Sequence, residues 1–218
     1  MFFPTTNEIW RWETPDPEDH WMMAGHLWLY GEDTILIDPP MQPQLPCALK
    51  ILGGVQAVLL TTADHTRGAR YVADVFRCPI YVPAQSLWVA SEALGACAVA
   101  YDESTPLPGD IHAIRCHISE PMWESETSAY LDEMMLVLPN GAVAVGDIAM
   151  GSPDGELWVC PEGFNRVVDP AKVQASLTAF AQTLPRDTTY LLASHGRDVI
   201  NMVCRALELR LASCSNGQ

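Results

Sequence analysis

The stretch QAVLLTTADHTRGARYVAD, residues 56–74, contains the strand-to-helix transition on which the fold depends. Its apolar run, Ala57 to Leu60, has the length and composition of a buried strand. A helical segment follows, in which the residues that share one apolar face are Val72, Val75 and Phe76. Between strand and helix lies the pair Asp64-His65. Polar side chains at such a junction usually face solvent or a functional site.

The Asp64-His65 pair has two interpretations. In the first, the Asp64 carboxylate caps the following helix and His65 is a surface residue. In the second, both side chains leave a rigid strand end together and form half of a metal site, as a carboxylate oxygen and an imidazole nitrogen. The other strand ends of the chain bear on this choice.

Two further polar groups also follow apolar strands. A hairpin ends in Gly146-Asp147, and the strand from Thr189 to Ala193 ends in Ser194-His195. In layered α/β proteins such strand ends converge on one rim, where sites are built. Two imidazoles and two carboxylates are enough to surround one metal ion. We therefore expect one metal site, formed by Asp64, His65, Asp147 and His195.

The length of 218 residues favours one domain over residues 1–218, and the composition, with 49% hydrophobic and 18% charged residues, indicates that it is globular. A last helix is expected from about residue 198 to 212. The net charge of −15 argues against nucleic acid and anionic membranes as partners, since both are bound through Lys and Arg. It is compatible with holding a divalent cation.

The segment MFFPTTNEIW has no basic region of the kind that begins a secretory signal, and no apolar run approaches about 20 residues. We expect a cytoplasmic protein that does not cross a membrane. The seven cysteines form no C-x-x-C pair, so the sequence indicates neither a disulfide framework nor a thiolate zinc site.

Five segments in this order resemble parts of one known family: GHLWLYGEDTILIDPP (25–40), LLTTADHTRGA (59–69), PLPGDIHAIRCHI (106–118), VAVGDIAM (143–150) and ASHG (193–196). They are similar to the first hairpin, the metal loop, the strand before the third metal-binding histidine, the bridging aspartate and the last histidine turn of the metallo-β-lactamase superfamily. The resemblance covers nearly the whole chain. It implies a four-layer αββα sandwich of the α/β (α+β) class, with two packed sheets and helices on both outer faces.

The chain departs from the family at the first metal site. The two paired histidines of the family fall on Leu60 and Thr62, and the third falls closest to Trp123. An alkyl side chain cannot ligate a metal, and Leu60 and Trp123 are expected to fill that volume. The residues that the resemblance retains are those of the second site: Asp64, His65 and His195, with Asp147 as the carboxylate that bridges the ions in the family.

The retained set implies a metal-dependent hydrolase with at most one ion, which would be zinc, iron or manganese. Asp64 and Asp147 are the expected catalytic residues. Asp147 would either ligate the ion or act as general base for a water whose pKa the ion lowers towards about 7. His65 is expected to be neutral, because the positive end of a helix lies nearby. The missing ion would have helped to polarise the carbonyl or phosphoryl oxygen of the substrate. Another group has to make that contact here, or the contact is lost.

The alternative is a non-catalytic relative with no metal, which uses the same fold to bind a small molecule or another chain. A small-molecule substrate or ligand is the expected partner, but no pattern identifies it or indicates the oligomeric state. Trp123 and Trp158 lie in segments that would rim the site, where they could pack an organic substrate. Aromatic residues are equally common in cores, so both interpretations of these two remain open.

Overall fold

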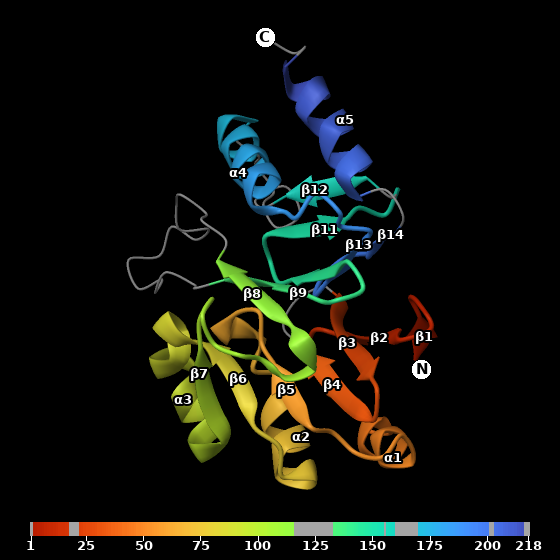
Figure 1. Ribbon diagram of the computed structural model, residues 1–218, viewed down its shortest axis with the longest axis vertical. Coiled ribbons are helices and arrows are strands. Elements are labelled where there is room, and N and C mark those ends of the chain that lie inside the picture. Colours follow the sequence, from red (N-terminus) through yellow and green to blue (C-terminus); the bar gives the residue numbers. More distant parts are fainter. Residues whose placement is uncertain are drawn as a thin grey trace.

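The computed structural model describes residues 2–17, 22–115, 133–154, 156–159, 170–200 and 203–215 (Figure 1). A seven-stranded sheet contains, in spatial order, β1 (Phe3–Pro4), β2 (Ile9–Pro15), β3 (Met22–Tyr30), β4 (Asp33–Ile37), β5 (Ala57–Leu59), β6 (Ile80–Pro83) and β7 (Ala98–Tyr101). Neighbours from β1 to β4 are antiparallel, and those from β4 to β7 are parallel. The side chains that follow β4 and β5 therefore lie at the same edge of the sheet.

A second sheet of five strands has the order β14 (Val199–Ile200), β13 (Tyr190–Ala193), β10 (Ala142–Val145), β9 (Met134–Val137) and β8 (His112–Arg115). Strands β10 and β13 are parallel neighbours, so the segments that follow them also emerge side by side. A separate pair is formed by β11 (Ala149–Gly151) and β12 (Leu157–Val159). The polar residues singled out in the sequence thus follow β5 in the first sheet and the adjacent strands β10 and β13 in the second.

Alternating side chains divide the strands between two cores. In β4, Ile35 and Ile37 face the core between the sheets, whereas Leu36 faces the opposite side. The inter-sheet core takes residues from both sheets, including Trp28, Ile35, Leu59, Met134, Leu136, Ala144 and Leu192. This period of two is what a strand buried on both faces requires.

Helices cover the outer face of each sheet (Figure 1). On the first sheet these are α1 (Leu45–Ile51), α2 (Ala69–Phe76) and α3 (Leu87–Leu94); on the second they are α4 (Pro170–Thr183) and α5 (Val203–Ser215). The outer cores contain Leu49, Val72 and Leu94 on one side, and Leu177, Phe180 and Leu207 on the other. The predicted αββα sandwich is confirmed. No helix in the described ranges combines the length and apolarity needed to cross a membrane.

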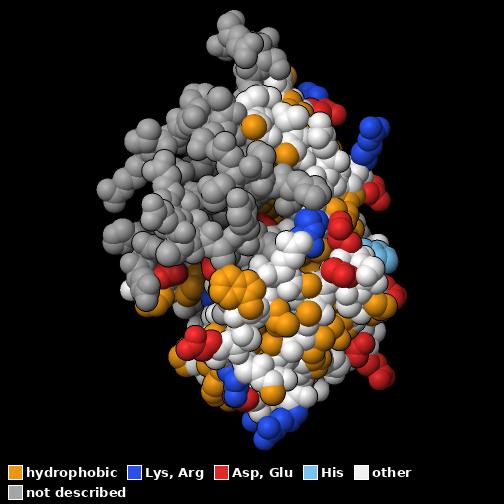
Figure 2. Space-filling view, turned by 90° about the vertical axis from the view of Figure 1, so that its left-hand side faces the viewer, with side chains coloured by type: hydrophobic (Ala, Val, Ile, Leu, Met, Phe, Trp, Pro, Cys, Tyr) orange, Lys and Arg blue, Asp and Glu red, His pale blue; other side chains and the backbone are white. Residues whose placement is uncertain are grey.

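Four short 3₁₀ turns complete the described elements: η1 (Ala63–His65), η2 (Ala84–Ser86), η3 (Gly95–Cys97) and η4 (Pro108–Asp110). On the face shown in Figure 2, few of the described side chains are Lys or Arg, as the net charge of −15 leads one to expect. Cys47, Cys78, Cys97 and Cys204 are free thiols.

The last helix begins later than predicted. Residues 199–200 form β14, which pairs with β13 through Val199 and Leu191, and α5 starts at Val203. The Asp198 carboxylate does not cap a helix, because it accepts hydrogen bonds from the Ala193 backbone N–H and the Arg11 guanidinium. These contacts, one of them with a residue 187 positions away, decide the local structure against the helical pattern of the sequence.

Candidate metal centre

His65 lies in η1, immediately beyond the end of β5. The Thr62 hydroxyl accepts a hydrogen bond from the Asp64 backbone N–H at 3.5 Å and so caps this short turn. His65 is only 2% exposed, and its Nδ1 atom lies 3.0 Å from Asp38 Oδ2. Because a carboxylate only accepts hydrogen bonds, we assign a proton to Nδ1. With Nδ1 bound to Asp38, the other ring nitrogen, Nε2, faces Asp147.

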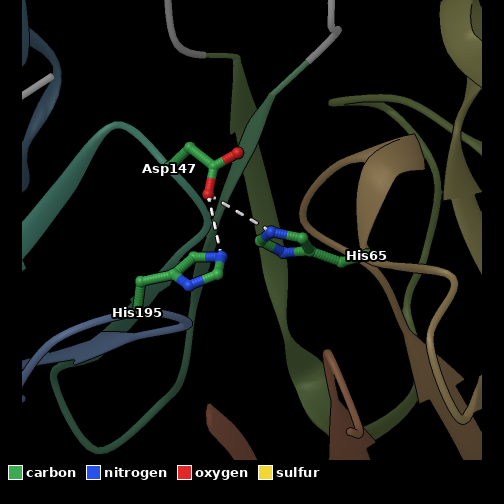
Figure 3. Close-up of side chains that lie close together, drawn as sticks. All are labelled: His65, Asp147 and His195. Atoms are coloured by element: carbon green, nitrogen blue, oxygen red, sulfur yellow. Dashed lines mark ion pairs between the residues drawn. The ribbon is translucent and has the colours of Figure 1, made fainter. Parts of the chain in front are cut away.

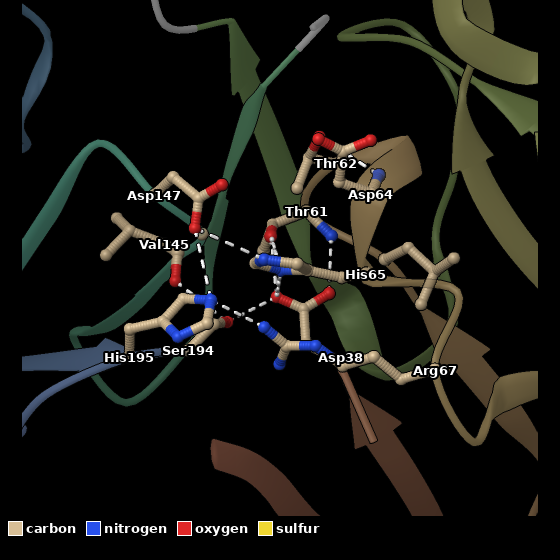
Figure 4. A network of polar contacts seen from close by, with 12 residues as sticks. Asp38, Thr61, Thr62, Asp64, His65, Arg67, Val145, Asp147, Ser194 and His195 are labelled. Carbon is tan, nitrogen blue, oxygen red and sulfur yellow. Dashed lines mark hydrogen bonds and ion pairs between the residues drawn. The ribbon is translucent and has the colours of Figure 1, made fainter. Parts of the chain in front are cut away.

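Asp38 follows β4 and is fully buried. Its carboxylate accepts hydrogen bonds from the Thr61 backbone N–H at 2.9 Å, the Thr61 hydroxyl at 2.6 Å and the Ser194 hydroxyl at 2.5 Å (Figure 4). Burial would raise the pKa of Asp38, but His65, Arg67 and Ser194 outweigh it and lower the pKa to about 2. Asp38 is therefore an ionised residue that fixes the orientation of the His65 ring.

Asp147 follows β10, and Glu133 holds the segment that carries it. The buried Glu133 carboxylate accepts hydrogen bonds from three consecutive backbone N–H groups, those of Gly146, Asp147 and Ile148, at 3.0–3.1 Å. Burial and the Asp147 charge raise the pKa of Glu133 to about 8. Burial also acts to raise the pKa of Asp147, but His65, His195 and Arg67 together lower it. Asp147 is thus the ionised carboxylate of the centre.

His195 follows β13 in a segment that is bound to the first sheet. The Ala24 backbone N–H donates to the Ser194 carbonyl at 2.8 Å, and Arg11 Nη2 donates to the Gly196 carbonyl at 2.5 Å. The His195 ring centroid lies 5.4 Å from that of His65. Burial, His65 and Arg67 all lower the pKa of His195, whereas the Asp147 charge raises it. The net result is a pKa of about 4. The ring is neutral at neutral pH.

His65, Asp147 and His195 converge on one point (Figure 3). One ligand atom from each lies within 4.8 Å of the others, and Asp147 Oδ1 is 3.3 Å from Nε2 of both histidines. Two ligands at 2.0–2.1 Å from a tetrahedral zinc ion would be about 3.3 Å apart. Within the described ranges, no donor approaches the buried Oδ1 atom in hydrogen-bonding geometry. These residues fit a metal ion.

The expectation that His65 is neutral is wrong for this arrangement. Burial and Arg67 lower the pKa of His65, but Asp38 and Asp147 outweigh them and raise it to about 9. The helix dipole has little effect here, because α2 begins only at Ala69 and His65 lies in a separate turn. Two flanking carboxylates favour a positive charge at this ring, either as a proton or as a metal ion on Nε2.

Asp64, the fourth predicted ligand, is exposed and is not one of the three residues whose ligand atoms converge. The other interpretation of the Asp64-His65 pair, a helix cap and a surface histidine, is wrong. The N-cap residue of α2 is Gly68, and no side-chain hydrogen bond caps this helix, so the Asp64 carboxylate is not its cap. His65 is buried and is not a surface residue. Asp64 remains a predicted catalytic and metal-binding residue.

Leu60 is fully buried in the core beneath α2 and α3, and Thr62 is 1% exposed. Leu60 supplies no ligand, and the Thr62 hydroxyl is engaged with the Asp64 backbone. Trp123 lies outside the described residues. Trp158 is half-buried on β12 opposite Met150, and its contact with a substrate remains a prediction.

The sequence reasoning assigned no role to Asp38, Glu133 or Arg67. Asp38 carries a signal in the sequence, since it follows the strand Thr34–Ile37 as the other polar residues follow theirs. Glu133 and Arg67 carried none, because their roles depend on tertiary contacts, with the backbone of Gly146–Ile148 for Glu133 and with His195 for Arg67.

No family model matches this chain, and neither does any curated protein. Solved structures do match. The metallo-β-lactamase FIM-1 from Pseudomonas aeruginosa, in its mono-zinc form, is 17% identical with a TM-score of 0.67, over 99% of this chain and 95% of that one. The chain has the metallo-β-lactamase fold.

Two further structures with the metallo-β-lactamase fold agree equally well. The enzyme from Erythrobacter litoralis is 18% identical with a TM-score of 0.67, over 99% of this chain and 96% of that one. The enzyme from Pontibacter korlensis is 14% identical with a TM-score of 0.68, over 99% of both chains. At such identities the likeness establishes the fold, and the chemistry has to be argued from the site itself.

Proposed function

We propose that this protein is a metal-dependent hydrolase that holds a single divalent ion on His65, Asp147 and His195. The observation that carries the proposal is the position of the Asp147 Oδ1 atom. It is buried, lacks a hydrogen-bond donor among the described residues, and lies 3.3 Å from each of two imidazole nitrogens. A buried carboxylate oxygen beside two imidazole nitrogens is stabilised by a cation or proton held between these atoms.

Zinc is the favoured ion, because two imidazoles and one carboxylate leave a fourth position open, as in catalytic zinc sites. Iron and manganese accept the same ligand types. A mono-zinc form is known for the neighbouring structure of FIM-1, which supports a one-ion centre here. When bound, such an ion would lower the pKa of a water molecule and polarise a carbonyl or phosphoryl group.

The protein's own residues would orient this chemistry. Asp38 fixes the His65 ring through Nδ1, and Glu133 holds the backbone of Asp147. With Asp147 Oδ1 directed at the two histidines, the role of general base falls to Asp64, whose exposed carboxylate follows β5 beside His65. Trp158 on β12 would pack against an organic substrate.

The substrate is proposed to be a small molecule with a hydrolysable ester, lactone, amide or phosphoryl bond. A centre with one ion lacks one electrophilic contact to the developing oxyanion, which is worth about 3–4 kcal/mol or about 10²–10³ in rate. Hydrolysis of generic esters, lactones and β-lactams is therefore expected to be slow, although dependent on metal.

The test compares wild type with Asp147→Asn and His195→Ala on a panel of these substrates, with excess zinc and with excess manganese. The matched control is His112→Ala, which removes an exposed histidine on β8. We expect slow turnover that both site variants abolish and the control retains. Turnover that survives both site variants would remove the metal from the mechanism, and absence of metal binding would favour a non-catalytic binding module.

A further inference from the structure

The Arg67 guanidinium lies inside the candidate metal centre (Figure 4). Its Nη2 atom donates a hydrogen bond to His195 Nε2 at 2.6 Å, and its Nη1 atom donates to the Ala24 carbonyl at 3.3 Å. Asp38, Asp147, Asp16 and Asp64 all interact electrostatically with this guanidinium. Arg67 is thus a positive group surrounded by carboxylates, in direct contact with a proposed metal ligand.

The backbone directs Arg67 into the centre. Arg67 has φ of +27°, a conformation that is unfavourable for a residue with a side chain. The next residue, Gly68, donates its N–H to the Pro39 carbonyl at 2.9 Å, and a Cβ atom at Gly68 would lie 2.9 Å from the same oxygen. The close approach to Pro39 therefore holds the chain in a path that points Arg67 towards His195.

The contact with His195 conflicts with metal binding. An imidazole Nε2 atom has one lone pair, which can accept one hydrogen bond or bind one metal ion. The guanidinium is always protonated, so it can only donate, and the lone pair of Nε2 is engaged while Arg67 remains in place. The same nitrogen is 3.3 Å from Asp147 Oδ1, on the side where the ion would bind.

We propose that Arg67 is a resident cation of this centre and competes with a divalent ion for His195 Nε2. Binding of the ion requires the guanidinium to leave that nitrogen. Because the Nη1 contact with Ala24 and the surrounding carboxylates keep the guanidinium close, its charge then opposes entry of a second ion. The inference rests on the proposed function, since it takes His195 as a metal ligand.

The experiment measures zinc affinity by competition with a chelator for wild type, Arg67→Gln and Arg67→Lys. The control is Arg70→Gln, which removes the same charge from an exposed arginine of α2 that is paired with Asp74 at 2.9 Å. Loss of a hydrogen bond between charged and neutral partners predicts zinc binding about 10–100-fold tighter in Arg67→Gln. Arg67→Lys should lie between that variant and wild type, because a lysine keeps the charge but not the planar fork.

A second measurement does not depend on metal. In protein freed of metal with a chelator, the ¹⁵N resonance of His195 Nε2 should shift in Arg67→Gln and stay unchanged in Arg70→Gln, because only the first variant removes its donor. If Arg67→Gln unfolds, the comparison of Arg67→Lys with wild type takes its place in both measurements.

Equal zinc affinity in wild type and Arg67→Gln would overturn the inference and leave the proposed function standing. Weaker binding in Arg67→Gln would also overturn it, because Arg67 would then position His195 for the ion. If neither protein binds zinc while both remain folded, the inference and the proposed function both fail.

Discussion

The Ser194 hydroxyl donates to Asp38 Oδ2 at 2.5 Å, and the same oxygen lies 3.0 Å from His65 Nδ1. One buried oxygen therefore joins the segment before His195, from the second sheet, to the ring orientation of His65, from the first. The relative position of the two proposed histidine ligands depends on this shared acceptor, so a change at Asp38 should affect stability and metal binding together.

Asp38→Asn is expected to lower the free energy of unfolding by about 3–5 kcal/mol, because it breaks a buried charge pair and replaces one acceptor by a donor. Zinc affinity should fall about 10–100-fold, as is common when a group that orients a ligand is lost. Urea denaturation and zinc titration measure the two effects. The control Ser194→Ala should cost only about 1 kcal/mol, since it removes one hydroxyl and leaves the ionised acceptor. Equal losses in the two variants would contradict the role given to the Asp38 charge.

Glu133→Ala should destabilise the protein by about 3 kcal/mol or more, because buried N–H groups of three residues would lose their acceptor. Glu133→Gln should cost less, since its amide oxygen can still accept from Gly146 and Ile148. The matched control, Glu156→Ala, removes an exposed carboxylate and should change stability by less than about 0.5 kcal/mol. Chemical denaturation gives all three values, and a loss at Glu133 as small as the control would show that the Asp147 segment does not depend on this contact.

The Asp198 carboxylate predicts an acid-dependent part of the stability. It is buried against Arg11 Nη1 at 2.5 Å and His26 Nε2 at 3.0 Å, and the Thr5 hydroxyl lies 3.3 Å away. Burial would raise the pKa of Asp198, but His26 and Arg11 outweigh it and lower the pKa below the ordinary value of 3.8. A lowered pKa stabilises the fold above the unfolded value, and this contribution is lost as pH falls through the folded value.

Asp198→Asn should therefore cost about 3–5 kcal/mol at pH 7, and the difference from wild type should shrink below about pH 4. Thermal or urea unfolding of both proteins between pH 3 and pH 8 measures this difference. A difference that stays constant down to pH 3 would mean that the Asp198 charge makes no contribution through its lowered pKa.

Much of the fold could be predicted because the determining signals are local. The apolar run Ile35-Leu36-Ile37 and the polar residues that follow the strands are visible in the sequence, and both correspond to features of the structure. The start of α5 was missed, because the partners of Asp198 are 172 and 187 residues away in the chain.

The candidate site was predicted only in part, because some of its residues are placed by local signals and others by contacts with distant parts of the chain. Asp147, His65 and His195 follow strand ends, where position along the strand predicts position in space. Asp64 also follows a strand, but η1 turns its neighbour His65 inwards while Asp64 is exposed. Arg67 reaches His195 through a long side chain on an unusual backbone conformation, and no sequence pattern indicates such a contact.

The central claim is that one ion binds to His65, Asp147 and His195. The decisive measurement is zinc stoichiometry by equilibrium dialysis on protein purified without an affinity tag, combined with X-ray absorption at the zinc edge. We predict one equivalent of zinc with two imidazole ligands in wild type and in His112→Ala, and loss of this zinc in Asp147→Asn and His195→Ala. Zinc that remains bound with unchanged ligands in both site variants, or no zinc in the folded wild type, would contradict the account.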